Sequence, residues 1–336
     1  MIKTKLLFLS MAFCMVSLSS QQRPMMMERD GKMPPPPPGG HAGGQPGGGG
    51  PDFEKQFDGI VKVESGTKEL KNETITSNEE GKNAVFVRGK NSVVNASDVK
   101  IRTKKNGSRG LYAAFGGTIS AKNIDVVTEG EHCAAFATDM GEGTVTVDGG
   151  TAVTKGKGSP VIYSTGDIKV TNLKGTAGNS EIAVIEGKNS VSIEKSVISG
   201  GSGLDGEVAA GIMLYQSMSG DAGEGTAFFT AKNSTLVNNA AGEKSAFFYV
   251  TNTKAVVNLE STKLEGNSGT LIMASGNNSR RGWGRSGSNG GQLEFNAFSE
   301  NLSGDIVVDE ISSLAFNLGA KSTYTGAVNV KKSGKG

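Results

Sequence analysis

The stretch IAVIEGKNSVSIEKSVISGG, residues Ile182–Gly201, contains the pattern that decides the fold. It holds three short pieces, Ile182–Ile185, Ser190–Ile193 and Val197–Ser199, whose apolar residues recur with the period of two that is typical of β-strands. The pieces are separated by EGKN and EKS, and the unit closes on Gly200-Gly201. Because Gly and Asn adopt positive φ at low cost, such corners predict one three-stranded turn of a solenoid.

The same unit recurs along the chain. GKNSV occurs at 89–93 and again at 187–191, AKNS occurs at 231–234, and a second unit is formed by Leu111–Ala114, Thr118–Ala121 and Ile124–Thr128. Short apolar runs mark the successive turns, most of them 22 to 29 residues apart: VFV at 85, LYA at 111, AAF at 134, VIY at 161, AVI at 183, IML at 212, FFY at 247, LIM at 271 and IVV at 306. This spacing predicts an all-β parallel β-helix of roughly nine to ten coils. A Greek-key sandwich is the rival, but its units would not repeat the same tripeptides at this spacing.

Composition agrees with a thin, repetitive body. The chain of 336 residues has 50 Gly, one Trp and 6% aromatic residues, and eight of its nine Pro lie in residues 1–51. Dense Gly with few charges and little Pro argues against a helical bundle, collagen and a long disordered body. The formal net charge is only +2, and the sequence has no basic stripe, so nucleic acid is excluded as a partner.

The N-terminal region predicts export. Lys3 and Lys5 precede the apolar run Leu6–Leu18, and small serines follow, so residues 1–20 form a signal peptide whose removal leaves no membrane span. We expect a secreted protein or one on an extracellular bacterial surface. Residues 21–51 are rich in Met, Pro and Gly without apolar periodicity, which predicts a disordered tether, and residues 52–336 form the β-helix. Cys133 is then the only thiol, so no intramolecular disulfide is expected.

The body resembles exported bacterial right-handed parallel β-helix repeat proteins, adhesin-like surface proteins with a pectate-lyase-like architecture. The resemblance covers roughly residues 84–330 and rests on the segments 116–136, 141–168, 213–225, 247–253, 281–291 and 302–314. It implies a right-handed solenoid and a surface role, and it carries over no catalytic residues. Members usually continue for another coil or two after the position of Val328–Val330, whereas this chain ends in KKSGKG. Either only this polar tail caps the last rung or the β-helix of residues 52–336 lacks its C-terminal coils, and an uncapped last rung would favour self-association by strand addition.

Two acidic motifs are the candidates for chemistry. DMGEG contains Asp139 and Glu142, and DAGEG contains Asp221 and Glu224. Glycoside hydrolysis needs two carboxylates facing one cleft, but recurrence of a motif in two coils is typical of a repeated turn, so we predict no enzyme. The same four residues could ligate calcium through oxygen atoms, the alternative being a solvated acidic corner. We expect no other cofactor.

A Gly-rich insertion is the candidate binding loop. Arg280, Arg281 and Arg285 flank Trp283 within GNNSRRGWGRSGSNGG, residues 276–291, and aromatic residues with Arg are typical of binding hot spots. The alternative is that Trp283 folds back over the side of the solenoid with an Arg stacked on it. We therefore expect a structural or adhesive module that binds a glycan or a surface protein. A polysaccharide lyase or glycoside hydrolase of the same architecture is the alternative.

Overall fold

All regular structure in the described part of the chain is β-sheet. The computed structural model describes residues 56–202, 208–278 and 283–329. These residues contain no helix that is long and apolar enough to cross a membrane. The described chain winds as a parallel β-solenoid of about ten turns, which confirms the predicted fold class.

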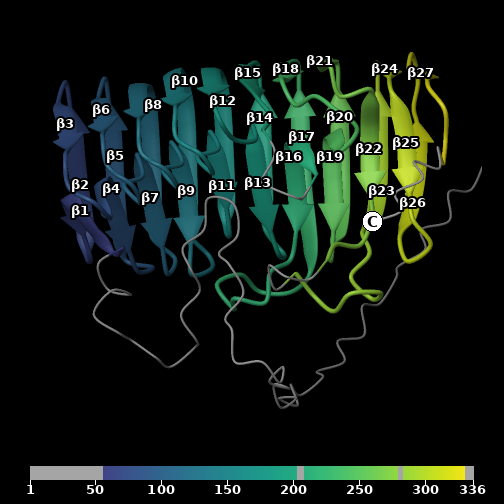
Figure 1. The fold of residues 1–336 in the computed structure, drawn as a ribbon. Coiled ribbons are helices and arrows are strands. Elements are labelled where there is room, and N and C mark those ends of the chain that lie inside the picture. Colours follow the sequence, from purple (N-terminus) through teal and green to yellow (C-terminus); the bar gives the residue numbers. More distant parts are fainter. Residues whose placement is uncertain (1–55, 203–207, 279–282, 330–336) are drawn as a thin grey trace, which may run out of the picture. The chain divides into compact units, whose positions relative to one another are not determined.

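Sheet A takes one strand from each turn (Figure 1). In spatial order its strands are β1 (Asp58–Val63), β4 (Lys82–Arg88), β7 (Leu111–Ala114), β9 (Phe136–Asp139), β11 (Ile162–Ser164), β13 (Ala183–Glu186), β16 (Ala209–Tyr215), β19 (Ser245–Thr251), β22 (Thr270–Ala274) and β25 (Asp305–Val308). All neighbours on this path pair in parallel, as expected when each strand follows its neighbour after one full turn of the solenoid.

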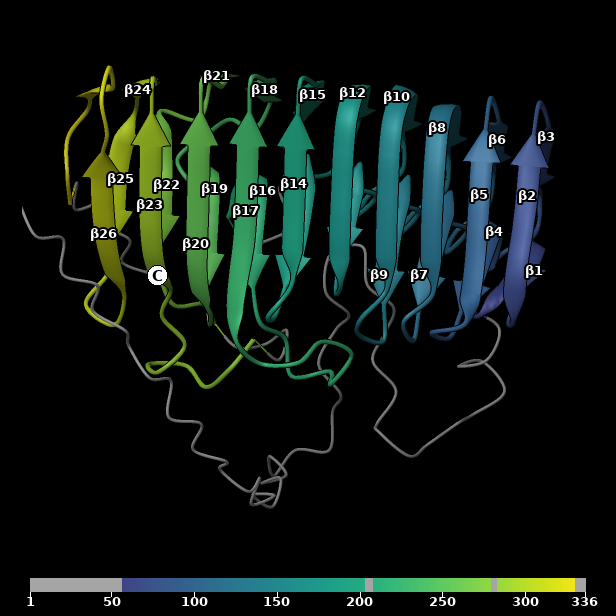
Figure 2. The same cartoon turned by 180° about the vertical axis from the view of Figure 1, so that it is seen from behind.

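Sheet B forms the opposite wall and faces the viewer in Figure 2. Its main path is β2 (Gly66–Lys71), β5 (Ser92–Ser97), β8 (Thr118–Thr128), β10 (Thr144–Thr154), β12 (Asp167–Ala177), β14 (Ser190–Glu194), β17 (Thr226–Lys232), β20 (Lys254–Glu260), β23 (Gln292–Phe298) and β26 (Ser313–Leu318). Shorter strands follow the same turns: β3 (Thr74–Ser77), β6 (Lys100–Thr103), β15 (Val197–Gly200), β18 (Thr235–Asn238), β21 (Lys263–Gly266), and the separate pair β24 (Asn301–Ser303) and β27 (Thr323–Thr325).

The predicted strands match closely. The three pieces of the quoted stretch correspond to β13, β14 and β15, with ends shifted by one residue at most. The two pieces predicted at Thr118–Ala121 and Ile124–Thr128 run on as one strand, β8, because Asn123 turns the corner at φ 49° without ending the pairing.

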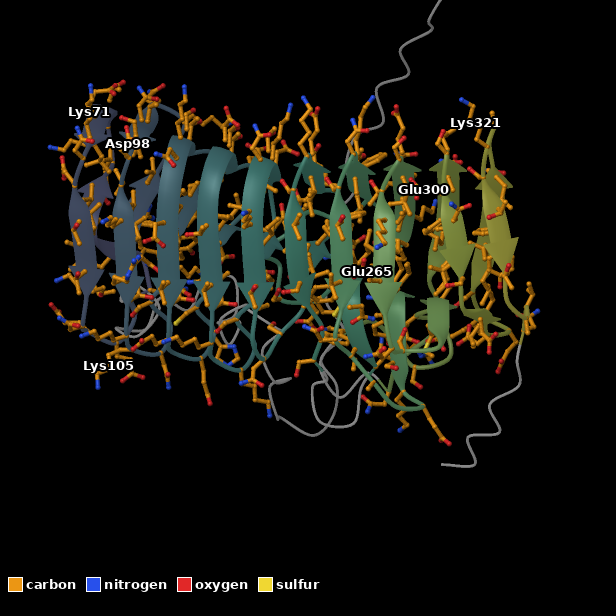
Figure 3. All side chains as sticks on the ribbon, turned by 90° about the horizontal axis from the view of Figure 1, so that it is seen from above. Lys71, Asp98, Lys105, Glu265, Glu300 and Lys321 are labelled. Atoms are coloured by element: carbon orange, nitrogen blue, oxygen red, sulfur yellow. The ribbon has the colours of Figure 1, made fainter. Side chains whose placement is uncertain are left out.

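Positive φ recurs at the corners of sheet B, either just after a main strand or, as in β8 and β12, within it. Asn72, Asp98 and Asn172 have φ values of 54°, 55° and 55°, the conformation expected of the corner residues. Figure 3 shows Lys71, Asp98 and Lys321 along this edge and Lys105 along the opposite one. Some of the charged residues of the repeat thus lie at the corners.

The interior is a continuous column of Val, Ile, Leu, Ala and Phe. In the later turns it becomes aromatic: the ring centroid of Phe248 lies 5.9 Å from that of Phe229 and 5.2 Å from that of Phe295. Burial decreases in the last described turn, where Leu318 is 42% exposed and Phe298 on the preceding turn is 52% exposed. Self-association at this rung stays a prediction.

Candidate functional site

The two sheets differ in how their outer faces are covered. Along sheet B buried and more exposed residues alternate, as in TVTVDGG of β10, so its outer side chains reach solvent. On sheet A every residue of β7, β9, β11, β13, β16 and β19 is buried. A sheet that is buried on both faces carries a second layer on its outer side.

Side chains of the first outer row of sheet A are mostly aromatic or apolar. The strand register aligns Phe86, Tyr112, Ala137, Tyr163 and Val184 in neighbouring rungs. Phe57 extends the row at one end, with its ring centroid 6.0 Å from that of Phe86. We call the buried aromatic residues of this face the outer aromatic row: Phe57, Phe86, Tyr112, Tyr163, Tyr215, Tyr249 and Trp283.

The second outer row carries carboxylates. Two residues farther along each strand, Asp139 ends β9 and Glu186 ends β13. The register of β9, β11 and β13 places Thr165 at the intervening rung. Rungs are about 4.8 Å apart, so the backbones of Asp139 and Glu186 are separated by roughly 10 Å. Both carboxylates are buried, with exposures of 3% and 0%.

Glu186 accepts hydrogen bonds on both of its oxygens. The hydroxyls of Tyr163 and Tyr215 donate to Oε2 at 2.9 and 2.8 Å. Ser217 donates to Oε1 through its backbone N–H at 3.1 Å and through its hydroxyl. Four donors around one carboxylate favour its ionised form and leave it little capacity to act as a base.

Asp221 joins this network through the loop of residues 216–225. Its Oδ1 accepts a hydrogen bond from the Ser219 hydroxyl, which is itself hydrogen-bonded to the Ser217 hydroxyl. The loop folds back over the rung of β13, since Lys188 N–H donates to the carbonyl of Gly223 at 2.9 Å. Asp221 is therefore placed beside Glu186, although the two residues are far apart in sequence.

Asp139 has a different set of partners. Its Oδ2 accepts a hydrogen bond from the Tyr112 hydroxyl at 3.1 Å and lies 3.5 Å from Nη2 of the buried Arg109. The Arg109 guanidinium also stacks over the Tyr112 ring, 4.4 Å from its centroid. The Met140 N–H donates to Oδ1 at 2.8 Å. This carboxylate is held in a fixed orientation by a cation, a phenol and the backbone.

The three carboxyl groups have raised pKa values. Burial, followed by the charge of Glu186, raises the pKa of Asp221 to about 7. Burial, followed by the charge of Asp221, raises the pKa of Asp139 to about 6. Burial also raises the pKa of Glu186, against the lowering effect of its hydrogen-bond donors. Carboxyl groups with distinct, raised pKa values at one site are typical of acid–base catalysis.

Two buried polar atoms beside the cluster have no hydrogen-bond partner among the described residues. They are Oγ1 of Thr165, between the rungs of Asp139 and Glu186, and Oε1 of Gln216, next to Ser217. Both residues are buried, with exposures of 0% and 7%. Buried polar atoms are nearly always paired, so these two are suited to a ligand or an ordered water molecule.

The structure divides the four residues predicted as metal ligands. It brings Asp139 and Asp221 into one electrostatically coupled cluster. It leaves Glu142 exposed in an ion pair with Lys90, at 3.2 Å, and Glu224 exposed on its loop. Among residues 56–202, 208–278 and 283–329, no three His, Cys, Asp or Glu side chains are grouped so as to hold a metal ion. A calcium site at these positions stays a prediction.

The predicted binding loop places its tryptophan inside. Trp283 is fully buried, its ring centroid lies 5.0 Å from that of Tyr215, and its carbonyl accepts hydrogen bonds from Asn277 and Asn289. Arg285 is exposed, whereas Arg280 and Arg281 lie outside the described residues. Trp283 thus packs over the side of the solenoid and closes the outer aromatic row.

Trp283→Ala is expected to destabilise the protein by about 3–5 kcal/mol, because it removes a fully buried indole from contact with Tyr215. Urea unfolding followed by circular dichroism measures the change. Arg285→Ala, at an exposed position of the same loop, is the control and should leave the unfolding midpoint unchanged. Unchanged stability of Trp283→Ala together with loss of glycan binding would instead identify Trp283 as a direct ligand-binding residue.

Sequence reasoning missed Glu186, Ser217 and the tyrosines of the site. Glu186 lies in the stretch Ile182–Gly201, where the sequence pattern assigns it to the polar corner EGKN. A usable signal was present: VFV, VIY, IML and FFY are apolar at consecutive positions, a pattern that indicates strands buried on both faces. A charged residue at the end of such a strand is then under a covering layer.

Comparison with known proteins gives one similar structure. No family model and no curated protein matches the chain. The catalytic domain of a GH87 α-1,3-glucanase, in complex with tetrasaccharides, is similar at 12% identity and a TM-score of 0.29. The match covers 80% of this chain and 64% of that chain, which is less than two thirds of the solved domain.

The similar structure is an enzyme, and this finding contradicts the prediction that the present chain is not one. The physical reason for the wrong prediction is the assumption that the two acidic motifs are equivalent exposed turns. The structure instead places one carboxylate of each motif in a common cluster, with Asp139 buried and Asp221 partly buried. At this identity and TM-score the likeness assigns neither substrate nor reaction to this chain.

Proposed function

We propose that the protein hydrolyses glycosidic bonds on the outer face of sheet A. The observation that carries this proposal is the cluster of Asp139, Glu186 and Asp221, three coupled carboxyl groups with raised pKa values on one side of the solenoid. Hydrolysis of a glycoside needs one protonated and one ionised carboxyl group on the two sides of the scissile bond.

Asp221 is the general acid in this proposal. With a pKa of about 7 it retains a proton near neutral pH, and that proton is transferred to the glycosidic oxygen as the bond from the anomeric carbon breaks. Asp139, with a pKa of about 6, is ionised at the same pH and takes a proton from the attacking water. The water oxygen bonds to the anomeric carbon, so the products are two sugars with their hydroxyl groups restored.

Glu186 is a positioning residue. Its four donors hold it in place, and its negative charge keeps the neighbouring Asp221 protonated. Because the loop of Asp221 folds over the rung of β13, the acid lies about two rungs, or roughly 10 Å in backbone separation, from Asp139 on β9.

The aromatic surroundings favour a carbohydrate over other hydrolysable polymers. The buried aromatic residues of this face come from β4, β7, β11, β16 and β19, whereas Ala137 and Val184 stand at the rungs of β9 and β13. Aromatic rings present large apolar surfaces and, in Tyr and Trp, a polar group that can hydrogen-bond to a hydroxyl. Export to an extracellular bacterial surface, indicated by residues 1–20, is part of the proposal.

The test is an activity screen with the full chain. Polysaccharides with α- and β-linked glucose, galactose, mannose and uronic acid backbones are incubated with the protein, and released reducing ends and unsaturated uronides are measured separately. Reducing ends without unsaturated products are expected from at least one substrate. Unsaturated products would contradict hydrolysis and indicate a lyase. Binding without release of any product would contradict catalysis.

A further inference from the structure

The short third strands of the later turns stop pairing between β21 and β24. β15, β18 and β21 form one hydrogen-bonded run, whereas β24 and β27 form a separate two-stranded sheet. At one end of this interruption, Ser261 N–H donates to the carbonyl of Phe298 at 3.1 Å. At the other end, Asp305 N–H donates to the carbonyl of Gly269 at 2.8 Å. A slit that is closed at both ends therefore lies between β21 and β24.

Glu300 occupies the beginning of the slit. It is 2% exposed, and its Oε1 accepts a hydrogen bond from Thr262 N–H at 2.7 Å. At the same corner of an earlier rung, Ser234 Oγ accepts a hydrogen bond from Ser196 N–H at 3.2 Å, and β15 pairs with β18 directly after it. The glutamate side chain is longer than that of serine, so Glu300 holds the two chain segments farther apart. Figure 3 shows Glu265 and Glu300 in these later turns.

Leu264 shows that the slit opens toward the interior. The strand register aligns this residue with Leu236 and Ile198, which are both 0% exposed. Leu264 stands in the same inward-facing column but is partly exposed. Because it pairs with β18 on one side, the cover that it lacks is on the side of β24. Part of the hydrophobic core is therefore accessible through the slit.

A cleft of about 250 Å³ lies at the end of the slit near Gly269. Its apolar side chains are Phe247, Leu264 and Leu271, and its polar side chains include Glu265, Ser268 and Ser303. Phe247 and Leu271 are buried, whereas Ser303 is exposed. The cleft is therefore apolar in its depth and polar at its mouth.

A glycine contributes to this opening. The register aligns Gly266, at the end of β21, with Asn238 at the end of β18. Asn238 is buried, and its side-chain amide donates to the carbonyl of Ala246 at 2.9 Å, which ties the end of β18 to the beginning of β19. Gly266 has no side chain to make the corresponding link from β21 to β22, so the space at this corner stays open.

We propose that this cleft binds one pyranose ring of a neutral glycan. A pyranose has an apolar face of C–H groups and an edge of hydroxyl groups, which match the apolar depth and the polar mouth. Phe247 supplies an aromatic ring for the apolar face, and Glu265 and Ser303 supply oxygen atoms that accept hydrogen bonds from the hydroxyl groups. None of the described residues that line the cleft is basic, so a neutral sugar fits better than a sugar acid.

The cleft is distinct from the carboxyl groups of the proposed active site. Asp139 and Glu186 lie at the ends of β9 and β13, whereas Thr270 and Leu271 of the cleft begin β22. β13 and β22 are three rungs apart in sheet A, or roughly 14 Å. The sugar site is thus additional to the proposed function, and only its role in holding a glycan near the carboxyl groups rests on that function.

The test is saturation-transfer NMR with the full chain. Methyl glycosides of glucose, galactose and mannose serve as probes, and cyclohexanol is an apolar control of similar ring size. We expect saturation to reach the ring C–H protons of at least one glycoside, and to exceed the transfer to cyclohexanol, which lacks most of the hydroxyl contacts. No transfer to any glycoside, or equal transfer to cyclohexanol, would overturn the proposal.

Variants at the mouth locate the binding. Ser303→Phe fills the cleft and should abolish the transfer, whereas Asn301→Phe, at an exposed position of the same strand that does not line the cleft, should retain it. Ser268→Phe blocks the cleft from its other side if circular dichroism shows that Ser303→Phe does not fold. Transfer that persists in a folded, blocked variant would contradict the assignment.

Asp221→Asn separates this site from the proposed active site. Sugar binding should be unchanged in Asp221→Asn, and Ser303→Phe should still release reducing ends from any substrate that the parent hydrolyses. Loss of transfer in Asp221→Asn but not in Ser303→Phe would place the sugar at the carboxyl groups and rule out the cleft. A parent protein that binds in the cleft but hydrolyses nothing contradicts the proposed function alone and still supports this site.

Discussion

Replacing Asp221 by Asn is expected to lower kcat for glycan hydrolysis by roughly 10²- to 10⁴-fold, the range that a positioned general acid contributes. The substitution keeps the shape of the side chain and its position beside Ser219 but removes the proton that the leaving oxygen needs. Steady-state kinetics on the substrate found in the screen measure the effect. The loss should appear in kcat more than in KM, because the proton is transferred in the transition state.

Glu224→Gln is the matched control, because Glu224 lies three residues away in the same DAGEG motif but is exposed. It should retain the full rate. Urea unfolding of both variants separates chemistry from folding: an Asp221→Asn protein that is at least as stable as the parent but inactive supports the assigned role. Equal rates for Asp221→Asn and the parent would remove Asp221 from the mechanism.

Glu186→Gln distinguishes a positioning residue from a catalytic one. Without the negative charge that raises the pKa of Asp221, the acid should lose its proton at lower pH. The basic limb of the pH–rate profile is therefore expected to shift to lower pH, with the rate at acidic pH less affected. A uniform loss of rate at every pH would instead assign Glu186 a direct role in bond cleavage.

Much of the architecture could be predicted because each coil of the repeat carries the sequence signals for its own strands and turns. The alternation in Ser190–Ile193 and the corner residues Asn123 and Asn172 fix strands and turns with information carried within a single coil. The strand ends of β13, β14 and β15 follow within one residue. A solenoid is favourable for such reasoning, because each turn contacts only its neighbours and no distant pairing has to be found.

The site could not be predicted in the same way because it depends on loops that interrupt the repeat. Asp221 lies beside Glu186 because the loop of residues 216–225 folds back over the rung of β13. Nothing in the sequence DAGEG indicates that the loop folds in this direction. The similarity of DAGEG to DMGEG was misleading as well. Asp139 lies in a strand and Asp221 in an insertion, so the two motifs have similar sequences but different structures.

The carboxylate cluster also predicts that the folded protein becomes more stable as the pH falls from 8 to about 4. The pKa values of Asp139 and Asp221 are raised in the folded state to about 6 and about 7, above the ordinary value of 3.8 for an aspartate. Between these values and 3.8, the folded state binds protons that the unfolded state does not, so lowering the pH favours folding. Above pH 7 both states are ionised, and the cost of burying the charges is fully present.

Each pKa unit corresponds to about 1.4 kcal/mol, so the two groups together should contribute about 7 kcal/mol over this range. Urea unfolding at pH 4.5, 6 and 8 measures the free energy of unfolding directly. Asp139→Asn and Asp221→Asn remove the charges, so each is expected to raise stability at pH 8 and to flatten the pH dependence. Glu224→Gln, which changes an exposed carboxylate of the same loop, should leave the slope as it is. Stability that rises with pH between 4.5 and 8 in the parent would show that these carboxyl groups are not buried together in the folded protein.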